Sequence, residues 1–175
     1  MFITFVHHEH KYPDLKMKRH WLLLLLGLIG PVWLQAQNTF DRFFEKKTMR
    51  IDFALSGDAQ SQSAAIEQIR EEPVWGGPVK NLVDPFHYGG YYIKVYDKAS
   101  RQLIYSRGFN TLFEEWRTTK EARTEKQSWT NNAVFPYPKA PVIFELLARD
   151  KADMQFHPLL RQEIDPKSIF IDRGT

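Results

Sequence analysis

Histidine and carboxylate side chains that could bind zinc cluster near the start of the chain, at His7-His8-Glu9-His10. Imidazole nitrogens and carboxylate oxygens are common zinc ligands. The cluster does not follow the helical H-E-x-x-H pattern, which places two histidines on one helix face. It also lies upstream of Met17, which is a better start codon. We therefore predict that residues 1–16 are an untranslated or mis-assigned start.

Later residues that could do chemistry do not combine into a catalytic scheme. His87 and His157 lie 70 residues apart, whereas a catalytic zinc needs three protein ligands. Glu114 and Glu115 are neighbours on a predicted helix and point in different directions, so an acid/base pair is not expected. The residues Ser56, Ser106 and Ser128 lack a nucleophile-elbow context. We predict that this chain is not an enzyme and holds no metal.

Aromatic residues are the better candidates for an interaction surface, because exposed Trp and Tyr stack on sugar rings and anchor protein interfaces. The candidates are Trp75, Tyr88, Tyr92, Tyr96, Trp129 and Tyr137. Most of these rings are expected to pack at the ends of the fold or under its loops. Tyr92 and Tyr96 are the strongest two, because they fall on the strand face opposite Tyr91, Ile93 and Val95. If no second sheet covers that face, it is a binding or docking surface.

The segment 17–36 has the layout of a secretory signal peptide. Lys18, Arg19 and His20 precede the apolar run 21–29, and a small-residue exit predicts cleavage between Ala36 and Gln37. A transmembrane anchor, the alternative, needs about 20 apolar residues. The uninterrupted run here is shorter. We expect export to the periplasm, the cell surface or the medium, with no stable membrane span after cleavage. The sequence contains no cysteine, which excludes a lipid-anchored lipoprotein.

Removing residues 1–36 from the 175-residue chain leaves 139 residues, the size of one domain, which we place at 37–175. That segment carries 20 Lys and Arg against 19 Asp and Glu, a net charge of +1. Binding to nucleic acid requires a concentrated basic surface. A nucleic-acid partner is therefore not expected.

The hydrophobic periodicity is mostly that of strands. Alternation of apolar and polar residues predicts strands over 49–55 and 142–148, a hairpin from the segments 91–96 and 102–106, and a last strand over 168–172. Residues 63–72 fit helix or strand almost equally, and residues 111–123 fit a helix. The Pro- and Gly-containing segments 73–88 and 135–141 are predicted to be ordered loops.

Six or seven short strands with one short helix predict a mainly β protein, a β-sandwich that follows a cleaved signal peptide. An immunoglobulin-like arrangement is one form of such a sandwich. A closed barrel is the alternative architecture.

Four motifs in a fixed order resemble the N-terminal domain of the IgA-peptidase family of secreted bacterial zinc metallopeptidases (peptidase family M, number sixty-four). They are the segment 40–52 with Gly57, Pro73-Val74-Trp75-Gly76-Gly77, the segment 109–116, and Pro136-Tyr137-Pro138-Lys139. In that family this region is a non-catalytic β-rich domain, and the zinc-binding H-E-x-x-H motif belongs to a separate catalytic domain that follows it. The resemblance implies that the catalytic residues and the zinc lie outside this chain.

Two hypotheses about function follow. The first is an accessory domain of a secreted metallopeptidase, on a truncated or orphan chain, which supports or positions the missing catalytic domain. Its partners would be that domain and, through it, a protein or glycoprotein substrate. The alternative is a free-standing exported module that binds a glycan or a protein.

Overall fold

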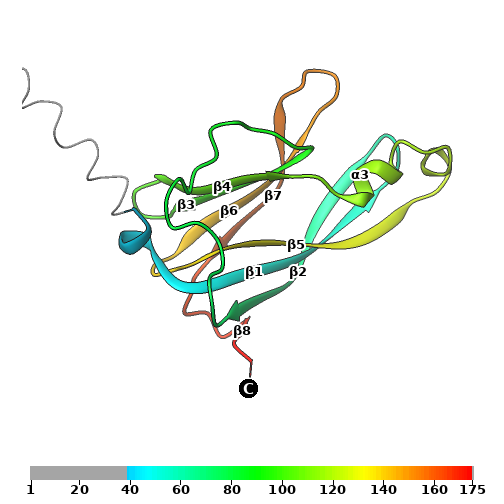
Figure 1. Ribbon diagram of the computed structural model, residues 1–175. Coiled ribbons are helices and arrows are strands. Elements are labelled where there is room, and N and C mark those ends of the chain that lie inside the picture. Colours follow the sequence, from blue (N-terminus) through cyan, green and yellow to red (C-terminus); the bar gives the residue numbers. More distant parts are fainter. Residues whose placement is uncertain (1–38, 175) are drawn as a thin grey trace, which may run out of the picture. The chain divides into compact units, whose positions relative to one another are not determined.

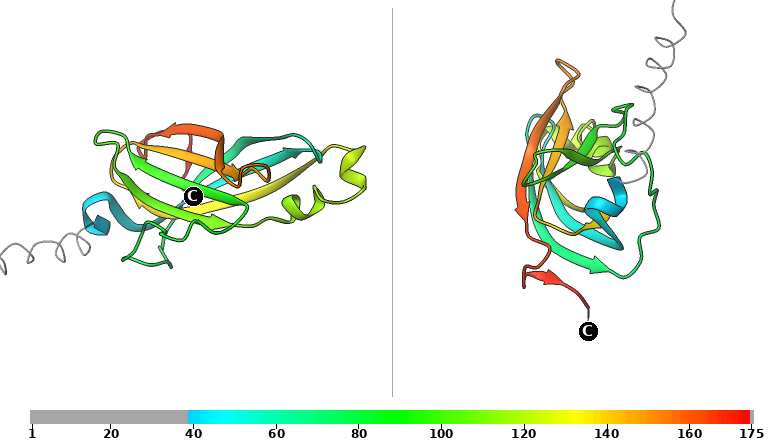
Figure 2. Two further views of the ribbon diagram at one scale, coloured as in Figure 1. Left: turned by 90° about the horizontal axis from the view of Figure 1, so that it is seen from above. Right: turned by 90° about the vertical axis from the view of Figure 1, so that its left-hand side faces the viewer.

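The computed structural model describes residues 39–174, in which eight strands form two four-stranded sheets. The predicted mainly β, sandwich-type fold is confirmed (Figures 1 and 2). Residues 1–16, the predicted signal peptide and its cleavage site at Ala36 and Gln37 lie outside the described residues. Among those described, no helix is both long and apolar enough to cross a bilayer.

The first sheet has the strand order β5-β1-β2-β8. Its strands are β1 (Phe44–Gly57), β2 (Gln62–Glu72), β5 (Gln127–Pro138) and β8 (Ile171–Asp172). β1 pairs antiparallel with both β2 and β5, whereas β8 runs parallel to β2.

The second sheet has the order β4-β3-β6-β7 and is antiparallel throughout. Its strands are β3 (Tyr91–Asp97), β4 (Leu103–Phe109), β6 (Val142–Arg149) and β7 (Phe156–Ile164). The loop of residues 73–90, called the β2–β3 loop below, runs along one side of the two sheets (Figure 2). It covers the edge of β4, where the Ser106 amide donates to the Leu82 carbonyl at 3.0 Å.

The core lies between the sheets and follows the predicted alternation. On β1 the side chains of Met49, Ile51, Phe53 and Leu55 are fully buried. The facing sheet contributes alternate residues of β3 and β6, among them the paired residues Val95 and Phe144. Burial of one such aliphatic or aromatic side chain stabilises the fold by about 1.5–3 kcal/mol.

Residues 63–72, which fitted helix and strand almost equally, lie in strand β2. A β-bulge explains the ambiguity, because Glu67 is an extra residue opposite the step from Asp52 to Phe53. Ile66 and Ile69 therefore pair with two core-facing positions of β1 although they are three residues apart. That spacing is typical of a helix, and here the bulge produces it in a strand.

The predicted helix over 111–123 is shorter than expected. α3 covers Leu112–Trp116, and a 3-10 turn, η1, covers Glu121–Arg123. The Thr111 hydroxyl caps α3 by accepting from the Glu114 amide at 3.1 Å. Phe113 and Trp116 are buried, whereas Leu112 is exposed.

Two predicted boundaries were wrong. Residues 135–138 belong to β5 and not to a loop, because Pro136 and Pro138 lie on an edge strand, where a missing N–H costs no ladder hydrogen bond. The last strand is confined to residues 171–172, since residues 165–170 turn the chain before it pairs with β2. β7 and residues 127–134 of β5 were not predicted as strands; in β7, exposed polar residues interrupt the alternation.

Candidate functional site

The six aromatic residues singled out from the sequence do not form one surface. Tyr92 and Tyr137 are buried, and Trp75, Tyr96 and Trp129 are partly exposed. Tyr88 alone among the six is strongly exposed, at 74%. The set divides into rings that hold the fold together and one ring that faces outward.

Tyr92 lies on the outer face of the second sheet, as its strand position indicates, but the β2–β3 loop covers it. Its hydroxyl donates to the Asp84 carbonyl and lies 3.0 Å from the Ser106 hydroxyl. The rings of His87 and Phe156 pack on it, with centroids 5.3 and 5.0 Å away. Burial raises the pKa of Tyr92. Its ring is therefore a support for the loop and not a binding surface.

The two tryptophans pack against the core. Trp75 donates from Nε1 to the Pro78 carbonyl at 3.0 Å and meets the Tyr105 ring edge-on. Its own ring folds over Gly77, where a Cβ would lie 2.3 Å from the indole. Trp129 donates to the Gln127 side chain at 2.8 Å and packs against the core. Both rings stabilise strand ends and loops.

An exposed aromatic pair, Phe86 and Tyr88, stands on the β2–β3 loop. The rings are 67% and 74% exposed and stack in parallel, with centroids 5.7 Å apart and planes within 7°. Sequence reasoning included Tyr88 and missed Phe86. The run Phe86-His87-Tyr88 was the signal that could have found it, because the His87 ring stacks on Tyr92 while the rings on either side of it in the sequence are exposed.

The loop that carries this pair is fixed by hydrogen bonds. The Asp84 carboxylate accepts from the Phe86 amide at 2.9 Å, and the Asp84 amide donates to the Ser106 hydroxyl at 3.0 Å. The Arg149 guanidinium donates to the carbonyls of His87 and Gly89. His87 has a φ of 55°, a left-handed conformation that a non-glycine residue adopts only when its surroundings hold it.

A groove of about 460 Å³ lies beside the aromatic pair, between the β2–β3 loop and β4. Its apolar lining includes Leu82, Pro85 and Tyr105, and its polar lining includes Asn81, Asp84, Ser106 and Arg107. Burial raises the pKa of Tyr105, and the neighbouring Arg107 opposes that shift. The groove therefore combines ring surfaces with amide, carboxylate and guanidinium groups.

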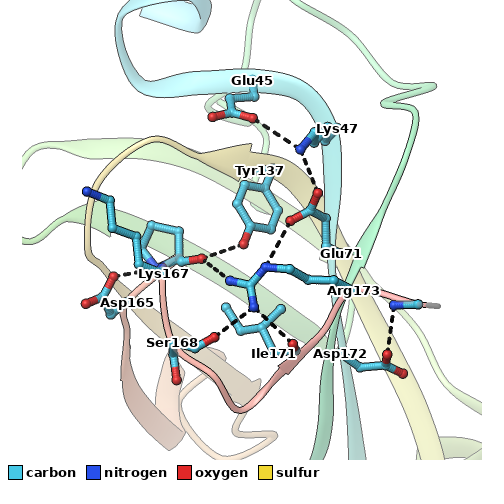
Figure 3. Close-up of polar contacts among 12 residues, drawn as sticks. Glu45, Lys47, Glu71, Tyr137, Asp165, Lys167, Ser168, Ile171, Asp172 and Arg173 are labelled. Carbon is cyan, nitrogen blue, oxygen red and sulfur yellow. Dashed lines mark hydrogen bonds and ion pairs between the residues drawn. The ribbon is translucent and has the colours of Figure 1, made fainter.

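A second feature is the clamped segment near the end of the chain (Figure 3). The Tyr137 hydroxyl donates to the buried Pro166 carbonyl at 2.6 Å, and Arg173 Nη2 donates to the same oxygen at 2.8 Å. Arg173 also donates from Nη1 to the carbonyls of Ser168 and Ile171. These bonds fold residues 165–170 into a turn, called the C-terminal turn below.

Charged neighbours attach this turn to the first sheet. Arg173 Nε lies 3.6 Å from the Glu71 carboxylate, which also accepts from Lys47 at 2.6 Å. The hydrogen bond to Glu71 raises the pKa of Lys47. Next to this polar cluster the C-terminal turn presents Ile169 and Phe170, which are 88% and 87% exposed. Few large apolar side chains of a monomer are this exposed, and adjacent ones indicate an interface.

Three side chains on the β6–β7 turn could contact a cation. Ligand atoms of Asp150, Asp153 and His157 lie within 4.8 Å of one another, and all three residues are exposed. Each already has a structural bond: His157 Nε2 lies 2.7 Å from Asp153, whose other oxygen accepts from the Gln155 amide, and Asp150 accepts from Ala152. Hydrogen bonds from the Gln155 amide and from His157 lower the pKa of Asp153. These hydrogen bonds close the β6–β7 turn.

The motifs that carried the family resemblance turn out to be anchors. Asn110 accepts from the Gly90 amide at 2.7 Å, which ties the start of α3 to β3. The Thr48 hydroxyl donates to the Val74 carbonyl at 2.7 Å, and the Lys139 amide donates to Phe43 at 2.9 Å. These residues join loops to strand ends, so the motifs have structural roles.

Comparison with known families places the chain. A family model described as "Peptidase M64 N-terminus" matches residues 39–159, which is most of the chain and extends from the first described residue into β7. The chain belongs to this family of peptidase N-terminal domains. The match concerns the N-terminal domain of the family and not its catalytic domain. No curated protein matches the chain.

Proposed function

We propose that this chain is a non-catalytic accessory domain that docks on a peptidase catalytic domain through its C-terminal turn. The observation that carries the proposal is the exposure of Ile169 and Phe170 on a turn that four hydrogen bonds to Tyr137 and Arg173 hold in place. A preformed turn loses little conformational entropy when it binds, so its apolar side chains can contribute most of their burial energy.

The surroundings of the turn favour a protein partner. A polar cleft lies beside the turn, and charged side chains of both signs line it. The basic ones are Lys47, Lys139, Lys167 and Arg173, and the acidic ones are Glu45 and Glu71. An apolar contact with a charged rim is the usual anatomy of a protein interface, in which the rim sets orientation. Supporting or positioning the catalytic domain is the role that the family membership and this surface support together.

A binding titration tests the proposal. The purified protein is titrated with the catalytic domain of a peptidase of this family, produced as a separate chain, and the Kd is measured by calorimetry. Phe170→Ser should weaken binding about tenfold or more, because loss of a buried Phe contact costs about 1.5–3 kcal/mol. Leu112→Ser is the matched control, since Leu112 is 65% exposed on α3. Equal affinities of wild type and Phe170→Ser would refute the docking site.

We also propose that the protein is exported by the signal peptide at residues 17–36. The support is the succession of basic, apolar and small residues in that segment, together with the resemblance of the chain to secreted peptidases. N-terminal sequencing of the product from a bacterial host should give Gln37 as the first residue. An N-terminus at Met1 or Met17 would contradict the proposal.

A further inference from the structure

The aromatic pair on the β2–β3 loop is not explained by the docking proposal. The second half of the loop lies on the side of the molecule away from β8 (Figure 1). Phe86 and Tyr88 contribute to no core cluster among the described residues. Folding therefore gains little from these two rings, and their arrangement has another reason.

The arrangement is costly to build and is fixed before any ligand arrives. His87 is held in the left-handed region, and its carbonyl and that of Gly89 accept from Arg149. Arg149 is itself positioned over the Phe156 ring, 4.2 Å from its centroid. Strained residues held by their surroundings cluster at ligand-binding sites, where preorganisation lowers the cost of binding.

The composition and size of the groove select the class of ligand. Ring faces stack on the C–H faces of sugars, and planar polar groups such as those of Asn81, Asp84 and Arg107 bind adjacent hydroxyls. Within residues 39–174, Arg107 forms no ion pair with a carboxylate, and its guanidinium lies beside the Tyr105 hydroxyl. The Asn81 side chain forms no hydrogen bond within the same residues, so its amide is available to a ligand.

A protein partner fits this site less well. A stable protein interface covers about 800 Å² on each partner, far more than two rings and one groove. The groove volume of about 460 Å³ lies in the range of small-molecule sites, about 300–1,000 Å³. We propose that Phe86, Tyr88 and the groove beside them bind a saccharide. This proposal does not rest on the docking of a catalytic domain.

A glycan array tests the proposal. The purified protein, made tetravalent on streptavidin to detect weak sites, is applied to an array of oligosaccharides, and the strongest signal is titrated by calorimetry. Tyr88→Ala and Phe86→Ala should each weaken binding about tenfold, because each removes one stacking face. Both rings are mostly exposed, so the variants should unfold at the temperature of the wild type. Leu112→Ala removes an equally exposed side chain on α3 and should bind normally.

Several results would overturn the proposal. They are no binding to any saccharide on the array, binding that both ring variants retain, and a Tyr88→Ala variant that loses affinity for the peptidase catalytic domain. The last result would assign the aromatic pair to a protein interface. Phe170→Ser should leave saccharide binding unchanged, so failure of this proposal and failure of the docking proposal can be told apart.

Discussion

The Pro166 carbonyl allows a quantitative test of the clamp on the C-terminal turn. It is buried and accepts from two donors, the Tyr137 hydroxyl at 2.6 Å and Arg173 Nη2 at 2.8 Å. Tyr137→Phe removes one donor and leaves the carbonyl satisfied by the other. The expected loss is therefore about 1 kcal/mol, the net value of one hydrogen bond, and not the larger cost of an unsatisfied group. In a domain of this size that loss lowers the Tm by about 3 °C.

The double variant with Arg173→Met should show the cost that the single variant avoids. With both donors gone the buried carbonyl has no partner, so the loss of stability in the double variant should exceed the sum of the two single-variant losses by about 1 kcal/mol. Urea unfolding of the wild type, both single variants and the double variant measures this coupling. Tyr88→Phe is the control, because its exposed hydroxyl should contribute nothing. Additive losses, within about 0.5 kcal/mol, would show that the two donors do not share an acceptor and refute the reasoning.

Three further predictions concern the core, two glycines and the β2–β3 loop. Burial raises the pKa of Tyr91 from 10.0 to about 12, so the unfolded chain ionises first and stability is lost as the pH rises from about 10 to 12. Urea unfolding at several pH values should show that the free energy of unfolding falls less for Tyr91→Phe than for the wild type, with a difference of about 2 kcal/mol at pH 12. An equal fall in both proteins would contradict the assigned pKa. Gly108→Ala should destabilise the protein by about 2 kcal/mol or more, because the added Cβ would lie 1.7 Å from the Tyr88 carbonyl oxygen. Gly90→Ala should destabilise it less, because its Cβ would meet the Glu114 carboxylate, which can move. Thermal melts rank the two, and the reverse order would disprove this account. Arg149→Met should lower the free energy of unfolding by about 2 kcal/mol and speed hydrogen exchange in residues 86–90, because three carbonyls lose a donor. Unchanged exchange would mean that other contacts fix the loop.

Much of the fold could be predicted from local pattern, and the exceptions have identifiable causes. Strict alternation marked β1, β3 and β6, because one face of each packs on the core. β2 was ambiguous since the bulge at Glu67 gives Ile66 and Ile69 a helical spacing. The end of β5 was taken for a loop because of two prolines that an edge strand tolerates. β8 was overextended, since its pairing joins residues about a hundred positions apart.

The candidate sites were less predictable than the fold. Exposure of an aromatic residue depends on which loop covers it, and no local pattern shows that the β2–β3 loop closes over Tyr92. Phe86 was missed because its exposure depends on the course of the β2–β3 loop, in which His87 stacks on Tyr92. Ile169 and Phe170 looked like part of a strand, and the clamp from Tyr137 and Arg173 turns them outward.

Hydrogen–deuterium exchange in the presence of a family catalytic domain tests the central claim most directly. Because the protein is proposed to dock through its C-terminal turn, saturating amounts of that domain should slow exchange in residues 165–174. Residues 117–126, around η1, should exchange as before. Slowed exchange elsewhere with an unchanged C-terminal turn, or no change in any segment, would contradict the account.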